Sequence, residues 1–219
     1  MLILMCVRKA KQILSRVEAQ DFSVEGIQGR EMRNLTIGII GAGRIGSIVA
    51  KNLSGFGCNL IAHDTVERDE LRGILKYVSL DELLEESDVI TIHTPLFEST
   101  YHMINQERIA KIKDGVCIIN CSHGAEVDTY ALIAGIEAGK AGAAGIDVLE
   151  DEEGIFHYDR RTDILDHRQL AILRSFPNVI VTPHTAFYPN QAVSDMAEMA
   201  LTSLVSFVET GKSRWEIKV

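Results

Sequence analysis

Cysteine is scarce in this chain: four of its 219 residues are cysteines. Cys117 and Cys121 lie close together, but no second pair of Cys or His residues has the spacing of a zinc-binding motif. Thiols without such a partner pair are typical of proteins in a reducing compartment. We therefore expect four reduced thiols, no metal site and a cytoplasmic protein.

The chain also has fewer basic residues than acidic ones. The chain has 22 Lys and Arg residues against 31 Asp and Glu residues, which gives a formal net charge of -9. A broad nucleic-acid-binding surface needs clustered Lys and Arg residues, so this balance excludes one. It leaves room for a local positive pocket that takes a small anion, and no nucleic-acid partner is expected.

Long apolar runs are missing too. The opening run, residues 1–7, is too short to cross a membrane and is followed at once by Arg8. It has no basic residue before it and no small-residue cleavage site after it, so it does not resemble a secretory signal. The apolar spacing over residues 1–19 predicts one amphipathic helix, and no membrane partner is expected.

The rest of the chain alternates short apolar runs with helical patterns, without internal repeats or low-complexity segments. Such alternation is typical of βαβ units, so we expect an α/β fold with a doubly wound parallel sheet of the Rossmann type. The expected strands are Thr36–Ile40, Leu60–His63, Val89–His93, Val116–Asn120, Ala143–Asp147 and Val179–Thr182. The expected helices are Ile45–Leu53, Leu80–Glu86, Gln106–Lys111, Thr129–Ala138 and a last one from Asn190 to Thr210. Residues 149–177 have weaker periodicity, which predicts a long connection.

A glycine-rich turn, Gly41-Ala-Gly-Arg-Ile-Gly46, stands between the first expected strand and the helix after it. The pattern G-x-G-x-x-G alone is a weak signal, but in this place it predicts a dinucleotide-binding turn. Gly41 permits the tight turn, Gly43 lets the backbone approach a pyrophosphate, and Gly46 lets the helix pack on the strand. The helix N-terminus then presents free N–H groups to the phosphates, and Arg44 adds a positive charge.

An acidic residue, Asp64, ends the second expected strand. A carboxylate about 20 residues beyond the glycine turn accepts hydrogen bonds from the adenosine ribose hydroxyls and repels a 2′-phosphate. We therefore expect NAD rather than NADP as the cofactor. The alternative is a turn with no ligand and a solvated Asp64. Strand, turn, helix and acid follow one another in the required order, which disfavours that alternative.

Five segments of the chain resemble the D-isomer-specific 2-hydroxyacid dehydrogenases, most of all their D-lactate dehydrogenase and vancomycin-resistance branch. These segments are Leu35–Gly46, Ser87–Leu96, Asp114–Asn120, Gly145–Glu150 and Pro177–Phe187. The resemblance implies a dinucleotide-binding domain over residues 20–186, a crossover helix over 1–19 and a C-terminal helix over 187–219. That last helix would return toward a substrate lobe, most of which is expected to be absent from this chain.

The resemblance also carries the family's cofactor contacts onto individual residues. Arg44 and Ile45 match pyrophosphate contacts, and Asp64 matches the ribose acid. The implied contacts beside the adenosine and the nicotinamide are Thr94, Pro95 and the weaker match Thr100, followed by Cys121, Ser122 and Asp147.

A proton donor and its partner follow from the same resemblance. His184 matches the family's acid/base, and Glu152 matches the carboxylate that pairs with it. An imidazole can both give and take a proton near neutral pH, which suits reversible exchange with a 2-oxoacid. Without the resemblance, a strand-capping His and a solvated loop Glu are the simpler interpretations.

One catalytic position departs from the family pattern. The family reads Asn-x-x-Arg-Gly where this chain reads Asn120-Cys-Ser-His-Gly124, so His123 replaces the arginine that clamps the substrate carboxylate. Arginine carries a permanent charge on a planar fork, whereas histidine offers one ring with a shorter reach and a partial charge. We expect impaired catalysis. An inactivating or trapping substitution explains the change better than a site reshaped for another substrate.

These patterns predict an NAD-dependent oxidoreductase domain that transfers a hydride between NADH and a small 2-oxoacid, giving a D-2-hydroxyacid. A homodimer is expected, and residues 1–19 should help form its surface, because this helix would otherwise expose an apolar patch formed by Leu2, Ile3, Leu4, Met5 and Val7. A non-catalytic NAD-binding module or sensor is one alternative. A dehydrogenase for formate, glycerate or phosphite is another, but the long segment Glu150–Ser175 favours the D-lactate branch.

Overall fold

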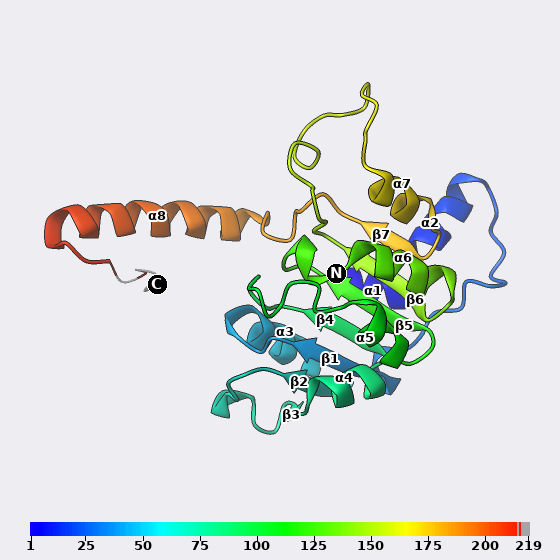
Figure 1. The fold of residues 1–219 in the computed structure, drawn as a ribbon, viewed down its shortest axis with the longest axis horizontal. Coiled ribbons are helices and arrows are strands. Elements are labelled where there is room, and N and C mark those ends of the chain that lie inside the picture. Colours follow the sequence, from blue (N-terminus) through cyan, green and yellow to red (C-terminus); the bar gives the residue numbers. More distant parts are fainter. Residues whose placement is uncertain (214, 216–219) are drawn as a thin grey trace. The chain divides into compact units, whose positions relative to one another are not determined.

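The computed structural model describes residues 1–213 and residue 215 (Figure 1). The chain divides into two compact units, Met1–Pro183 and His184–Val219, and each is described by itself. The first unit holds the whole sheet. The second holds one long helix, α8 (Asn190–Thr210), which Gly211 ends in the left-handed conformation with a φ of 71°. The helix expected from Asn190 to Thr210 is therefore confirmed.

A seven-stranded parallel sheet forms the centre of the first unit, in the order β3-β2-β1-β4-β5-β6-β7. Its strands are β1 (Thr36–Ile40), β2 (Asn59–His63), β3 (Lys76–Tyr77), β4 (Val89–Ile92), β5 (Val116–Asn120), β6 (Ala141–Ile146) and β7 (Val179–Val181). Six of them are the expected strands. The sequence did not predict β3, an edge strand of two residues. The doubly wound α/β fold is confirmed.

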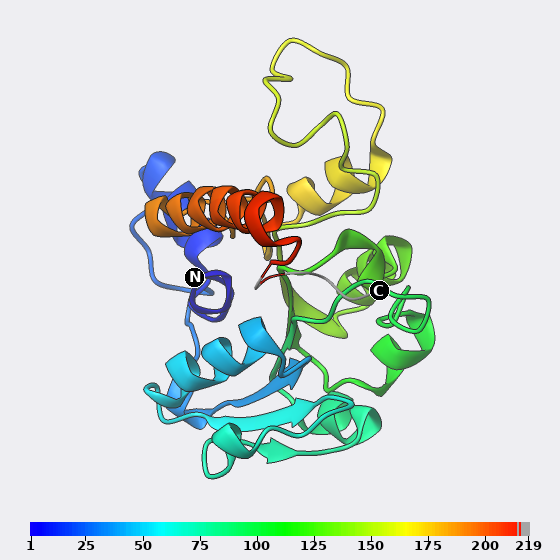
Figure 2. The same cartoon turned by 90° about the vertical axis from the view of Figure 1, so that its left-hand side faces the viewer.

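Helices cover both faces of this sheet (Figures 1 and 2). On one face lie α1 (Leu2–Val7) and α3 (Arg44–Ser54); on the other lie α4 (Leu80–Glu86), α5 (Gln106–Lys111), α6 (Thr129–Glu137) and α7 (Arg168–Ser175). Side chains of β1 alternate between the faces, so Ile37 packs with Leu53 of α3 and Ile40 packs with Leu83 of α4. Both faces are buried, which explains the continuous apolar strands.

Residues 1–19 form two helices, α1 and α2 (Ala10–Glu18), rather than the single helix expected. The chain breaks at Lys9, whose φ of 54° lies in the left-handed region. α1 packs against β5, β6 and β7. The residues that it buries there are Leu2, Ile3, Cys6 and Val7. The expected exposed patch on this helix is therefore wrong, because the sheet already covers its apolar side.

The long connection after β6 also differs from expectation at its end. The weak periodicity over residues 149–177 predicted no helix, but α7 closes the connection before β7. Its N-cap is His167, whose Nδ1 accepts a 3.2 Å hydrogen bond from the backbone N–H of Leu170. Among the residues that the structure describes, no helix is long and apolar enough to cross a lipid bilayer.

Candidate active site and dinucleotide-binding site

The glycine turn has the geometry that its sequence predicts. Gly41 has a φ of 87°, and a Cβ placed on it would lie 2.8 Å from the backbone of His93, so a larger residue does not fit. A Cβ on Gly46 would lie 1.9 Å from the carbonyl oxygen of Gly41, which explains how α3 closes onto the turn. At Gly43, no described atom lies within 4 Å of such a Cβ. The backbone there stays open to a phosphate group.

α3 begins at this turn, with Gly43 as its N-cap. Arg44 and Ile45 are its first two residues and both are exposed, Ile45 to 65%. The Arg44 side chain is therefore available to an anion at the helix N-terminus, where the free backbone N–H groups of the first turn and the helix dipole attract negative charge.

Asp64 lies beside the same turn, at the end of β2. Its Oδ2 accepts a 2.6 Å hydrogen bond from the backbone N–H of Ala42, and its Oδ1 accepts one of 3.1 Å from Val66. The carboxylate is thus fixed in orientation by two backbone donors. A carboxylate so placed accepts ribose hydroxyls and disfavours a 2′-phosphate.

One cavity of about 520 Å³ joins these features at the carboxyl ends of β1, β2 and β4. The expected cofactor residues in its wall are Gly41, Gly43, Asp64, Thr94, Pro95 and Thr100. The sheet order reverses between β1 and β4, and doubly wound sheets bind their ligands at this point. The wall residues that the sequence interpretation missed include His93, Arg68 and Arg108.

The wall opposite the glycine turn is a loop that runs from β4 to α5. Thr100 shapes it, since its Oγ1 accepts a 2.7 Å hydrogen bond from the N–H of Phe97 and donates one of 2.8 Å to the carbonyl of Pro95. His93 starts the loop, with Nε2 lying 3.0 Å from Thr91 Oγ1. Burial lowers the pKa of His93 to about 4, so this imidazole is neutral near pH 7.

Glu126 is a buried acid that sequence reasoning missed. Its Oε1 accepts a 2.5 Å hydrogen bond from Thr94 Oγ1, and its Oε2 accepts one of 3.2 Å from the backbone N–H of His123. Ser122 Oγ donates to the carbonyl of Thr94. Burial raises the pKa of Glu126 although these donors oppose the shift. The two predicted residues Thr94 and Ser122 are therefore in contact with each other, and Thr94 is also bound to Glu126.

Two residues expected beside the nicotinamide follow neighbouring strands: Cys121 follows β5 and Asp147 follows β6. Asp147 is buried, and its Oδ1 accepts a 2.5 Å hydrogen bond from Thr182 Oγ1. Burial, followed by the charge of Asp147, raises the pKa of Cys121 to about 11. Cys121 is thus a protonated thiol beside a carboxylate.

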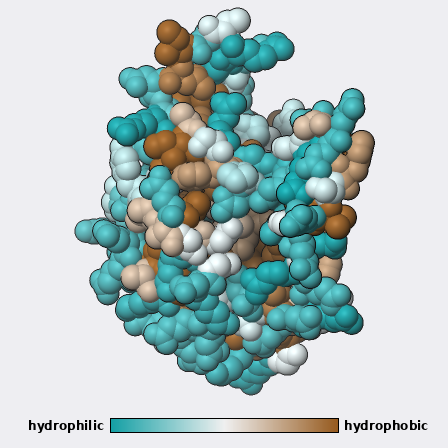
Figure 3. Space-filling model, turned by 90° about the vertical axis from the view of Figure 1, so that its right-hand side faces the viewer, coloured by the Kyte–Doolittle hydropathy of each residue, from teal (hydrophilic) through white to brown (hydrophobic). Residues whose placement is uncertain are grey.

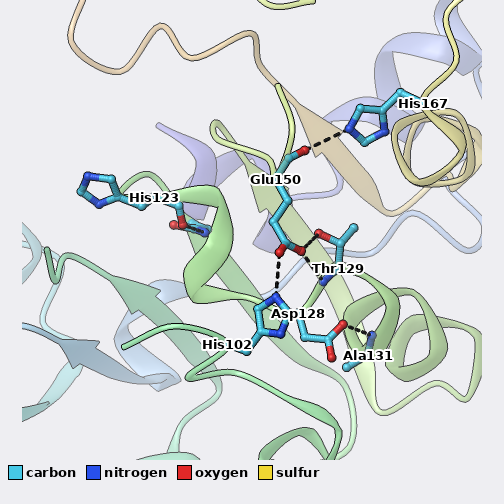
Figure 4. Close-up of polar contacts among 8 residues, drawn as sticks. His102, His123, Asp128, Thr129, Ala131, Glu150 and His167 are labelled. Atoms are coloured by element: carbon cyan, nitrogen blue, oxygen red, sulfur yellow. Dashed lines mark hydrogen bonds and ion pairs between the residues drawn. The ribbon is translucent and has the colours of Figure 1, made fainter. Parts of the chain in front are cut away.

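His123 lies exposed on the same rim of the sheet. Asn120 braces the turn that carries it, because its Nδ2 donates a 2.8 Å hydrogen bond to the carbonyl of His123 and its Oδ1 accepts one of 3.1 Å from Ser122. In Figure 4 the ring of His123 points away from the cluster around Glu150. The side chain is accessible to a small anion but reaches less far than an arginine.

The two remaining catalytic candidates fall in different units. Glu152 belongs to the first unit, where its Oε2 accepts a 2.7 Å hydrogen bond from the backbone N–H of Leu149. His184 belongs to the second unit, has a φ of 52°, and meets the ring of Phe187 edge-on at 5.9 Å between centroids. The pairing of Glu152 with His184 therefore stays a prediction.

Known proteins share this fold and these sequence features. Residues 1–186 match the family described as D-isomer specific 2-hydroxyacid dehydrogenase, NAD binding domain. The chain belongs to this family. It is 46% identical over 207 residues to an aromatic 2-oxoacid reductase of Clostridium sporogenes, covering 94% of this chain and 62% of that protein. It is 42% identical over 207 residues to a D-specific alpha-keto acid dehydrogenase of Enterococcus faecalis, covering 94% of this chain and 63% of that protein.

A solved structure agrees with this assignment. A D-lactate dehydrogenase from Sporolactobacillus sp is similar to this chain with a TM-score of 0.93 and 41% identity, over 99% of this chain and 65% of that one. The chain thus spans between 62% and 65% of the length of these three relatives. NAD is the cofactor of the family, and the open Gly43 backbone and the cavity beside Asp64 fit it.

Within the described part of this NAD-binding domain, no group of three or more His, Cys, Asp or Glu side chains is arranged to hold a metal ion.

Proposed function

We propose that this chain is the NAD-binding part of an oxidoreductase that interconverts a small 2-oxoacid and the corresponding D-2-hydroxyacid. The supporting observation is the cavity at the sheet reversal, because its wall combines the glycine turn, Asp64 and the Thr94–Thr100 loop. The relatives reported above are named for 2-oxoacid, alpha-keto acid and D-lactate chemistry. A D-lactate-like substrate is the class that we favour.

Bound NADH would supply the hydride, and the residues of this chain would supply orientation and the proton. We assign His184 as the group that gives a proton to the 2-oxoacid oxygen, with Glu152 as its carboxylate partner. Asp147 and Ser122 would hold the nicotinamide side, and Arg44, Ile45 and the α3 N-terminus the pyrophosphate.

His123 weakens this activity in our proposal. The family arginine would bind the substrate carboxylate through two parallel hydrogen bonds, which histidine cannot reproduce. Loss of one such electrostatic group costs on the order of 100- to 1,000-fold in rate. The same substitution is the observation that favours a second candidate function, an NAD-binding module that does not turn over substrate.

A homodimer is proposed as the assembly, through the α2 part of the segment 1–19 that was expected to help form its surface. α2 buries none of its residues, and its Leu14 and Val17 are 59% and 52% exposed. Phe22 and Val24 follow it and are also exposed. Figure 3 faces the side on which α2 lies in Figure 1 and shows apolar areas on a mostly hydrophilic surface. A two-fold pairing would cover the apolar residues of α2. We also expect the protein to be cytoplasmic, since its four thiols are free.

The test measures binding and turnover on the same chain. NADH is titrated by nicotinamide fluorescence, and NADH oxidation is then followed with pyruvate and with an aromatic 2-oxoacid. Binding with slow turnover supports the impaired enzyme, and binding with no turnover supports the non-catalytic module. The absence of NADH binding at millimolar concentration would overturn both. Light scattering at micromolar concentration tests the dimer, which a monomer would contradict.

A further inference from the structure

A polar cluster outside the expected site residues joins three loops of the first unit (Figure 4). His102 comes from the loop between β4 and α5, Thr129 begins α6 beyond β5, and Glu150 follows β6. Each loop leaves the carboxyl end of a different strand. His102 and Glu150 are 48 residues apart in the chain, so only the sheet order brings them together.

Glu150 is the centre of the cluster. Its Oε1 lies 2.7 Å from His102 Nε2, and its Oε2 accepts a 2.9 Å hydrogen bond from Thr129 Oγ1 and a longer one from the Thr129 N–H. The side chains of His102 and Glu150 are only 30% and 24% exposed. A short, partly buried pair with additional donors is worth more than a solvated surface pair.

The backbone of Glu150 is held as well. His167 Nε2 lies 2.9 Å from the Glu150 carbonyl oxygen. The Nδ1 of that ring accepts from Leu170, so its Nε2 carries the proton and donates to Glu150. On the other side, a Cβ on Gly124 would lie 2.2 Å from the carbonyl carbon of Leu149, which shows how closely the segment sits on that turn.

His102 is presented in one fixed orientation. Its φ of 46° is unusual for a residue with a side chain, and its N–H donates a 2.7 Å hydrogen bond to Ala125. Its ring stacks on Tyr101 at 4.1 Å between centroids. Ile104, two residues later, pairs with Val127 in a parallel bridge. Surrounding contacts thus hold a strained backbone conformation, and such strain often marks a functional position.

The pair connects two segments that carry different parts of the proposed site. On one side, the loop that holds His102 also supplies Thr94 and Thr100 to the cavity. On the other side, Glu150 is two residues before Glu152, whose carboxylate is bound by the N–H of Leu149. A shift of the cofactor loop would therefore pull on the segment of Glu152 through His102.

We propose that His102 and Glu150 are a positioning pair that couples the cofactor loop, residues 94–103, to the segment 148–156 that carries Glu152. The pair does not touch the reacting atoms in this proposal. It makes the orientation of Glu152 depend on whether the cofactor loop is held in place. The inference rests on the proposed function, since it needs NADH to bind beside that loop.

Hydrogen–deuterium exchange of the full chain, with and without NADH, tests the coupling. In the unmodified chain, NADH should slow exchange over both 94–103 and 148–156. In His102→Leu, protection over 94–103 should persist while protection over 148–156 is lost, with NADH binding weakened roughly three- to tenfold. His102→Gln keeps an N–H donor and should restore part of the coupling. Asp114→Asn, which weakens the 2.9 Å pair with Lys140 at the opposite ends of the strands, is the matched control and should change neither segment.

The outcomes separate this inference from the proposed function. If the unmodified chain binds no NADH, the proposed function fails and the inference falls with it. If NADH binds but protects only 94–103 in the unmodified chain, or still protects 148–156 in a folded His102→Leu chain, the inference alone is wrong. Should His102→Leu not fold, Glu150→Gln gives the same reading. It removes the charge and keeps an acceptor, so reduced NADH-dependent protection over 148–156 supports the pair, and full protection contradicts it.

Discussion

The N–H of Ala42 donates a 2.6 Å hydrogen bond to Asp64, which ties the glycine turn to the end of β2. Asp64 thus lines the cavity and also stabilises the turn through this hydrogen bond. Cofactor choice and turn geometry therefore depend on one carboxylate.

Replacing Asp64 should narrow the preference for NADH over NADPH. The unmodified chain should bind NADH at least tenfold more tightly, because the carboxylate repels a 2′-phosphate. Asp64→Ala removes that repulsion and should weaken NADH binding, since the ribose partner and the Ala42 contact are both lost. Parallel fluorescence titrations with the two cofactors measure the gap, and equal affinities in the unmodified chain would contradict the assignment.

Of the alanine substitutions at two glycines of the same turn, one should impair folding and the other should impair only cofactor binding. In Gly46→Ala the new methyl group would lie 1.9 Å from the Gly41 carbonyl oxygen, so the turn must shift. The free energy of unfolding should therefore fall by about 2 kcal/mol or more, which lowers the melting temperature. Gly43→Ala meets open space and should fold normally, yet bind NADH more weakly because the methyl group obstructs a phosphate. Thermal melts and NADH titrations of both variants check this. A Gly43→Ala chain that melts as early as Gly46→Ala would count against it.

Burial of His93 predicts an acid-side loss of stability. The folded pKa of about 4 lies below the usual value of 6.5, so the unfolded chain takes up this proton first as pH falls. As pH falls from 6.5 to 4, His93 should lower the free energy of unfolding by about 1.4 kcal/mol per pH unit. Above pH 6.5 it should have no effect on that free energy. Urea denaturation at pH 7, 5.5 and 4.5 measures the slope. His93→Gln should flatten it, and an unchanged slope would refute the assignment to His93.

Cys121 should be a slow nucleophile. Burial and the charge of Asp147 raise its pKa to about 11, so at pH 8 its thiolate fraction is on the order of 100-fold below that of a free cysteine. Alkylation by iodoacetamide, read by peptide mass spectrometry, should be correspondingly slow in the folded chain and fast in urea. Rapid modification at pH 8 in the folded state would show that the thiolate is stabilised instead.

Turnover should respond to His123 in a chain that also carries a substrate lobe. There, His123→Arg should raise kcat/KM for pyruvate by about 100-fold or more, because the bidentate carboxylate clamp is restored. Adding His184→Ala should remove most of that gain, since the proton donor is lost. If the form with His123 already works at ordinary enzyme rates, His123 must itself be an effective substrate ligand.

The sequence predicted the features that depend on local pattern. Six strands, the glycine turn and Asp64 follow from apolar runs and residue spacing, and the structure places Gly41, Gly43 and Asp64 in the wall of one cavity. β3 was missed because two residues are too few to show a period. The break at Lys9 was missed because a positive φ on a lysine leaves no trace in the apolar spacing.

Contacts set by the sheet order could not be predicted from the sequence. Glu126 meets Thr94 across 32 residues, and Glu150 meets His102 across 48. Each partner alone resembles an ordinary loop residue. Only the order β4-β5-β6, with loops leaving the same ends of these strands, makes them neighbours. The assignment of Glu152 and His184 came from family resemblance and stays a prediction.

The two edge strands of the sheet are short: β3 has two residues and β7 has three. An edge strand exposes backbone groups that can template pairing with a foreign chain, and the hazard grows with the length of straight, unpaired edge. A seven-stranded sheet of apolar strands contains much sequence with a high β-propensity. Its two edge strands, however, leave only a few backbone N–H and C=O groups unpaired within the sheet. The fold should therefore resist strand-to-strand aggregation as long as it stays folded, and fibril formation should require that the inner strands first be exposed by unfolding.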